Sequence, residues 1–150
     1  MIELQEIVVV DRPRAAVFDL VSRIDRLPLW LPGIRQASLL SPPPISTGSA
    51  IRLAVDGPTG PVDAEGEVTE LSAPGRLAFR TTKAPVELDA AVDLVERSPS
   101  STELRLSARL VLPGMLRFAE GMVRKRIEQE RARLVVELAS RLEAAIPSDA

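Results

Sequence analysis

The chain has 150 residues, of which 19 are basic and 21 acidic, and its net charge is −2. This length suits one ordinary domain with a sizeable core, and the near-neutral charge gives no broad positive field for nucleic acid. The chain has no Cys, His or Tyr, which excludes disulfides, thiolate metal sites and the commonest general base. Catalysis would have to depend on carboxylates, Lys or Arg, and we expect neither a metal nor a cofactor.

The N-terminal residues lack the basic region and apolar run of a signal peptide, and no stretch reaches membrane-spanning length. We therefore expect a soluble cytoplasmic protein without stable membrane insertion. Because there is no linker, internal repeat or low-complexity tract, the sequence predicts a single domain over residues 1–146. Residues 147–150 read as a disordered tail.

The first third of the chain predicts one strand followed by two short helices. Residues 2–10 combine β-branched residues with partial alternation, which is typical of a strand. Asp11 is the expected N-cap of a short amphipathic helix with Pro13 in its first turn and Val17, Phe18, Leu20 and Val21 on its apolar face. Asp25 is the expected cap of a second, shorter helix over residues 27–31, which the following Pro-Gly pair must end.

Six further strands are predicted before residue 113. Each is a run of alternating apolar and polar residues, bounded by turn residues such as Pro, Gly, Ser and Asp. This alternation is typical of antiparallel sheets with one wet and one covered face, and the short connections favour sequential pairing. The runs cover residues 34–40, 51–55, 62–71, 76–81, 86–94 and 103–112, and a turn is predicted at 56–61.

Residues 114–145 predict one continuous helix. At about 1.5 Å per residue, it would run on the order of 45 Å. Each large apolar residue on its stripe is worth roughly 2 kcal/mol when buried, so we expect the stripe to be covered. The stripe consists of Leu116, Ala119, Val123, Ile127, Leu134, Leu138 and Leu142.

The order of these elements predicts an α+β fold. A seven-stranded, curved antiparallel sheet would supply the apolar surface, and the long C-terminal helix would pack across it. Two short helices would lie between the first strand and the second.

Two segments and the order of elements resemble a known superfamily. Residues 11–21, with the sequence DRPRAAVFDLV, and residues 27–32, with the sequence LPLWLP, are similar to the START-like superfamily. Within it the chain resembles the polyketide cyclase/dehydrase and lipid transport group, also called SRPBCC proteins, over nearly its whole length. The resemblance implies a helix-grip fold with a cavity for a hydrophobic ligand. The group has no universal catalytic signature, so no catalytic residue is carried over.

Small residues on the inward face of the predicted sheet are the first candidate site. Ala64, Gly66, Ala90 and Ala108 could leave room for a ligand beneath the helix, or they could let the helix approach closely. The pattern alone favours close packing, whereas the resemblance favours a cavity. Its wall would be aliphatic, formed by Ile51, Leu53, Val68, Phe79, Leu88, Val92, Leu106 and Leu110, with Val123 and Ile127 from the helix.

Charged residues near the helix stripe are the second candidate. Glu120, Glu130 and Arg131 fall close to the apolar centre of the helical wheel. They could reach a cavity mouth and grip the polar end of a ligand, or they could pair locally on the surface. The local pairs would be Glu120 with Arg124, Arg126 with Glu130, and Glu128 with Arg131, and this surface interpretation is the favoured one.

Trp30, the only Trp, is the third candidate. It is expected to plug the space between the short helices and the sheet, and a contact with a ligand is compatible with that role.

The leading functional hypothesis is a non-catalytic carrier of a small hydrophobic molecule such as a lipid, quinone or polyketide. The alternative is a polyketide cyclase or dehydratase that uses Glu120, Glu130 or Arg131. It is weaker because no other polar strand residue clearly faces inward; the facing of Glu6 and Gln36 is left open. A third hypothesis is a protein-interaction module.

Overall fold

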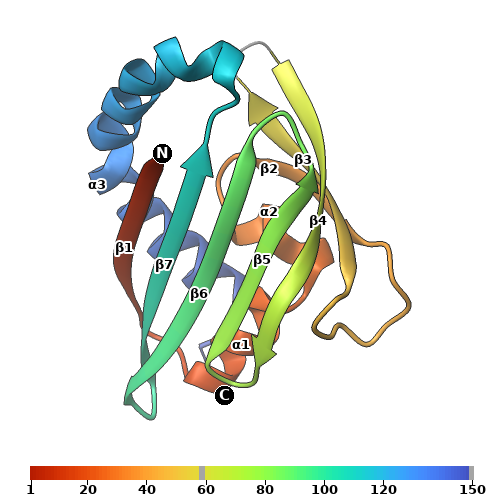
Figure 1. Cartoon of the computed structure of the whole chain (residues 1–150). Helices are drawn as coiled ribbons and strands as arrows, with labels where there is room; N and C mark the ends of the chain where they lie inside the picture. The colour runs from red at the N-terminus through yellow and green to blue at the C-terminus, as the bar shows by residue number, and fades with distance from the viewer. Residues whose placement is uncertain (58–59, 149–150) are drawn as a thin grey trace.

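The computed structural model describes residues 1–57 and 60–148. Within these residues it shows a seven-stranded sheet and one long helix (Figure 1), which confirms the predicted fold class. The strands are β1 (Ile2–Val10), β2 (Ile34–Leu39), β3 (Ala50–Gly57), β4 (Gly60–Ser72), β5 (Arg76–Lys83), β6 (Glu87–Ser98) and β7 (Ser101–Val111).

The sheet order is β1-β7-β6-β5-β4-β3-β2, and every neighbouring pair is antiparallel. Strands β2 to β7 therefore form the predicted meander. The pairing of β1 with β7, which places Leu4 opposite Ala108 and Val8 opposite Leu104, joins the two ends of the sequence. The edges of the sheet are thus β1 and β2, and the sheet curls around one face (Figure 1).

The short helices are α1 (Arg14–Val21), the 3₁₀ turn η1 (Ile24–Arg26) and α2 (Leu27–Trp30). Both predicted caps are wrong. Pro13, not Asp11, is the N-cap of α1, because Asp11 lies too early to reach the first turn. Asp25 lies inside η1, so Arg26 immediately precedes α2 and neither N-cap makes a side-chain hydrogen bond.

The concave face of the sheet carries the core, as the alternation predicted. Buried side chains from β1 and from β3 to β7 meet α1, α2 and the C-terminal part of the long helix. The largest fully buried side chains are Trp30, Leu27, Ile51, Leu104, Leu138, Leu142, Val8, Val10, Val17, Val21 and Val68.

The long helix differs from the prediction in its first part. It begins as a 3₁₀ segment, η2 (Gly114–Ala119), and continues as α3 (Glu120–Ala145). Leu138 and Leu142 are fully buried, whereas Leu116 is exposed and Val123 is only half-buried. The expectation of a fully covered stripe is therefore wrong for the first turns. The reason is geometric, since α3 runs along the edge strand β1 before its C-terminal half passes behind the sheet (Figure 1).

Arg12 fixes the C-terminal end of α3. Its guanidinium donates hydrogen bonds to the carbonyl oxygens of Ile146 at 2.7 Å and Glu143 at 2.7 Å. The backbone carbonyl of Arg12 accepts a bond from the hydroxyl of buried Thr102 at 2.8 Å. A cation on the last carbonyls of a helix satisfies acceptors that the helix itself leaves free. Arg12 therefore locks α3 to the β1–α1 connection.

Two predictions fall partly on undescribed positions. The turn at 56–61 includes residues 58–59, and the tail at 147–150 includes residues 149–150, which lie outside the described residues. Among the described residues, no helix is both long and apolar enough to cross a membrane.

Candidate ligand-binding site

A pocket of about 250 Å³ lies where α3 passes the edge strand β1 and the loop after α2. Leu4, Ile127, Leu134 and Pro32 supply apolar walls, and charged side chains from α3 supply the remaining lining. The charged residues are Glu130, Arg133 and Glu137. This combination of apolar walls with a few polar groups is the usual chemistry of a site for a small amphipathic molecule.

Only two of the predicted site residues, Ile127 and Glu130, line this pocket. Leu134 belongs to the predicted stripe, but it was not proposed as a ligand contact. Leu4, Pro32, Arg133 and Glu137 were missed as well. Leu4 could have been found from the alternation of Ile2 to Val10, which places it on the inward face of β1.

Leu4 connects the pocket to the inward face of the sheet. It lies opposite Ala108 on β7, which in turn lies opposite Ala90 on β6. Ala90 then lies opposite Phe79 on β5. Ala90 and Ala108 are half-buried although they face inward. The row of inward-facing side chains that starts at Leu4 in the pocket therefore continues across the sheet to Ala108 and Ala90, which are both small.

Gly66 has a different role from these alanines. It lies at an irregularity in the pairing of β4 with β5, where the register shifts after Glu65. A Cβ atom at position 66 would lie 2.5 Å from the backbone oxygen of Arg80. Since such a contact is shorter than any ordinary packing distance, the missing side chain allows the two strands to approach each other.

Most of the predicted cavity wall lies in the main core. Six of its members share one cluster with Trp30, whereas Leu88 and Leu110 are half-buried opposite each other on β6 and β7. Trp30 is 1% exposed, and its indole Nε1 has no hydrogen-bond partner among the described residues. The six clustered wall residues are Ile51, Leu53, Val68, Phe79, Val92 and Leu106.

Arg131 does not form the predicted pair with Glu128. It forms an ion pair with Glu6 of β1 and also donates a hydrogen bond to the backbone oxygen of Gln5. The hydrogen bond to Glu6 is the main reason why the pKa of Arg131 is raised, with a smaller contribution from Glu128. Glu6 is thus an inward-facing, buried acid, whereas Gln36 is exposed on β2.

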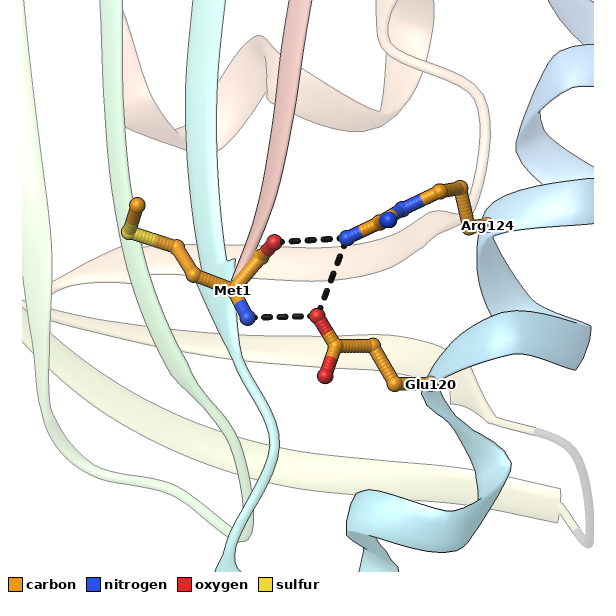
Figure 2. A network of polar contacts seen from close by, with 3 residues as sticks. All are labelled: Met1, Glu120 and Arg124. Atoms are coloured by element: carbon orange, nitrogen blue, oxygen red, sulfur yellow. Dashed lines mark hydrogen bonds and ion pairs between the residues drawn. The ribbon is translucent and has the colours of Figure 1, made fainter.

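Glu120 lies outside the pocket and binds the N-terminus of the chain. Figure 2 shows its Oε1 between the amino group of Met1 at 2.5 Å and Nη2 of Arg124 at 3.0 Å. Arg124 also donates a hydrogen bond to the Met1 carbonyl oxygen at 2.8 Å. The hydrogen bond from the N-terminal amine lowers the pKa of Glu120, and the charges of that amine and Arg124 lower it further.

Glu130 forms its predicted local pair and also lies at the pocket. Its carboxylate lies 3.7 Å from the guanidinium of Arg126, which confirms the predicted local pair. Both side chains remain largely exposed, and Glu130 also lines the pocket. A rim carboxylate of this kind can turn between its surface partner and a bound polar group.

A larger depression, of about 550 Å³, lies on the outer face of the sheet. Three of its four charged lining residues are already paired, since Arg76 binds both Asp93 and Glu70 and Arg109 lies near Glu3, whereas Asp89 is the fourth. The hydrogen bond to Asp93 is the main reason why the pKa of Arg76 is raised. We therefore place the candidate site at the smaller, apolar pocket between α3 and β1.

Comparison with known proteins agrees with this architecture. Residues 1–143 match the sequence model of a family described as polyketide cyclase/dehydrase and lipid transport. A START superfamily protein from Mycobacterium smegmatis superposes with a TM-score of 0.75 and 18% identity, over 95% of this chain and 98% of that one. The Zhui aromatase/cyclase from Streptomyces sp. R1128 superposes with a TM-score of 0.76 and 15% identity, over 96% and 92%.

A third similar structure is the di-domain aromatase/cyclase BexL of the BE-7585A biosynthetic pathway. Its TM-score is 0.73 at 18% identity, over 95% of this chain but only 47% of BexL, so this chain spans about half of that protein. A search of curated proteins gave no match. At these identities the structural likeness establishes the fold.

Proposed function

This chain belongs to the polyketide cyclase/dehydrase and lipid transport family, and from this premise we propose that it binds a small hydrophobic molecule between α3 and β1. The observation that supports this proposal is the pocket itself, in which apolar walls meet charged residues at a surface opening. An amphipathic ligand would place its apolar part against Ile127 and Leu4. Its polar end would meet Glu130 or Arg133.

The pocket volume of about 250 Å³ lies below the roughly 300–1,000 Å³ of typical small-molecule sites. In this conformation it fits a short apolar group, so a longer ligand requires α3 to move outward from β1. The first turns of α3 are suited to such movement, because none of their side chains is fully buried and an exposed hydrogen bond from Arg124 to the Met1 carbonyl oxygen ties them to the start of β1. Regions held by few buried apolar contacts open at low free-energy cost.

The test is binding of saturated fatty acids of increasing chain length and of the naphthoquinone menadione, followed by thermal shift and native mass spectrometry. Ile127→Trp would fill the pocket and weaken binding at least tenfold. Val136→Trp is the matched control, because Val136 is on the same helix and 69% exposed. We expect the control to bind as the unmodified protein does.

Retained binding by the Ile127→Trp variant would place the ligand elsewhere and overturn the proposed site. Absence of binding for every probe would overturn the carrier function for these ligand classes.

A polyketide cyclase is the second candidate function. The observation that favours it is the group of ionisable side chains at the pocket, Glu130, Arg133 and Glu137, which could act as acid, base or anchor. The test is incubation with a poly-β-ketone thioester and detection of cyclised products by mass spectrometry. Turnover that is lost in Glu130→Gln but kept in Glu143→Gln would support this function over passive binding.

A further inference from the structure

An exposed apolar stripe lies on η2 and the first turns of α3. Met115 is 87% exposed, Phe118 is 84% exposed and Met122 is 75% exposed. They are spaced by three and four residues, so they share one face of this helical segment. Burying such side chains is favourable by about 1.5–3 kcal/mol each. The stripe is therefore an unusual feature for a surface helix and indicates a partner.

The same segment is strongly basic. Residues 114–126 contain Arg117, Arg124, Lys125 and Arg126, and the single acid among them is Glu120. Glu120 is already bound by the amine of Met1 and by Arg124. Arg117 and Lys125 form no ion pair with any described residue. Since the whole chain has a net charge of −2, this local excess of positive charge contrasts with an acidic remainder.

The position of the segment also suits docking. Figure 1 shows the first turns of α3 at one end of the molecule, beside the start of β1 and beyond the end of β7. An amphipathic helix with Phe and Met on one face and Lys and Arg beside them binds at a membrane interface.

We propose that Met115, Phe118 and Met122, with Arg117, Lys125 and Arg126, dock this protein on a membrane surface that contains anionic lipids. The apolar side chains enter the interface, and the basic side chains contact the lipid phosphates. A second copy of the chain is a poorer partner, because two such segments face to face would place eight basic side chains against one another. This docking surface does not depend on a bound ligand.

The experiment is co-sedimentation of the full chain with phosphatidylcholine vesicles, with and without phosphatidylglycerol, at low and high salt. We expect binding to the vesicles that contain phosphatidylglycerol, weakening as salt screens the attraction. Phe118→Ser would weaken binding about tenfold, whereas Val136→Ser, at a 69% exposed position on α3 outside the basic segment, would not change it. Arg117→Gln and Lys125→Gln would each weaken binding about fivefold, with Arg97→Gln on β6 as control.

Equal binding to phosphatidylcholine alone would overturn the role of the basic residues. Equal effects of Phe118→Ser and Val136→Ser would overturn the role of the stripe. Sedimentation velocity without lipid provides a further check, because a dimer that dissociates in the Phe118→Ser variant would assign the stripe to self-association. Ile127→Trp should keep vesicle binding, which separates this proposal from ligand binding.

Discussion

Glu6 and Arg131, which lie 125 residues apart in the sequence, form an ion pair that fastens α3 to the edge strand β1. The two sides of the pair differ in their surroundings. The Glu6 side chain is 9% exposed, whereas the Arg131 side chain is 45% exposed. Removing one partner therefore has a different consequence from removing the other.

We predict that Arg131→Ala lowers the midpoint of urea unfolding more than Glu6→Gln does. Arg131→Ala leaves a buried carboxylate without its cation, which is costly. Glu6→Gln removes that charge and lets the Arg131 guanidinium turn to water. Double-mutant cycles measure the coupling, with the exposed Arg126–Glu130 pair as a control that should couple only weakly. Equal effects of the two single variants would show that the buried Glu6 carboxylate does not need the Arg131 guanidinium as its counter-ion.

The contacts of Glu120 predict that the stability of the fold depends on pH. The pKa of Glu120 lies below the ordinary value of 4.5, and the main cause is the hydrogen bond from the N-terminal amine. A carboxylate with a lowered pKa in the folded state stabilises the fold above its ordinary pKa, and this contribution is lost as pH falls through the lower, folded value. Acetylation of the N-terminus should therefore raise the pKa of Glu120, measured by NMR titration of its side-chain carboxyl. An unchanged titration after acetylation would contradict the contact shown in Figure 2.

Most of the fold was predictable because its elements follow simple periods. The alternation in residues 86–94 and 103–112 identified β6 and β7 and the side chains that face inward. The helical period similarly identified α3. These signals are local, because they depend only on apolar residues that recur every two positions in a strand and every three or four positions in a helix.

The candidate site was predicted only in part, because its geometry depends on where α3 meets the sheet. Pairing of β1 with β7 makes β1 an edge, and α3 runs along that edge instead of covering its whole stripe. Periodicity cannot reveal this offset. Pro32 and Leu4 come from distant elements that only the tertiary fold brings to Ile127. By contrast, the inward facing of Glu6 follows from its spacing of two and four residues from Val8 and Val10, which share its face of β1.

Gly66 predicts a sharp intolerance to a side chain. Gly66→Ala would place a Cβ atom against the backbone oxygen of Arg80, and overpacking of this kind costs about 1–3 kcal/mol. Gly75→Ala is the matched control, because its Cβ would lie 3.9 Å from the nearest backbone atom, an ordinary contact. Urea unfolding of both variants measures the difference. If the Gly66→Ala and Gly75→Ala variants had equal free energies of unfolding, β4 and β5 would be able to move apart and admit the added Cβ atom without cost.

Arg12 predicts how firmly the C-terminal end of α3 is held. Arg12→Ala removes donors to the carbonyl oxygens of Glu143 and Ile146, and loss of such charge-assisted bonds at a helix C-terminus costs about 2 kcal/mol. Lys at this position can restore the charge but not the two-pronged geometry, so Arg12→Lys should recover only part of the loss.

Arg97→Ala, at an exposed position on β6, is the control for simple removal of a basic residue. The readouts are the free energy of unfolding and the hydrogen exchange of the backbone amides near Leu142. If Arg12 acts as a cap, exchange should accelerate in the last turns of α3 and remain unchanged near Val123, at the other end of the helix. Uniform acceleration along α3 would instead show that Arg12 stabilises the whole domain without a specific hold on this end, because a local cap influences only the turns whose carbonyl groups it satisfies.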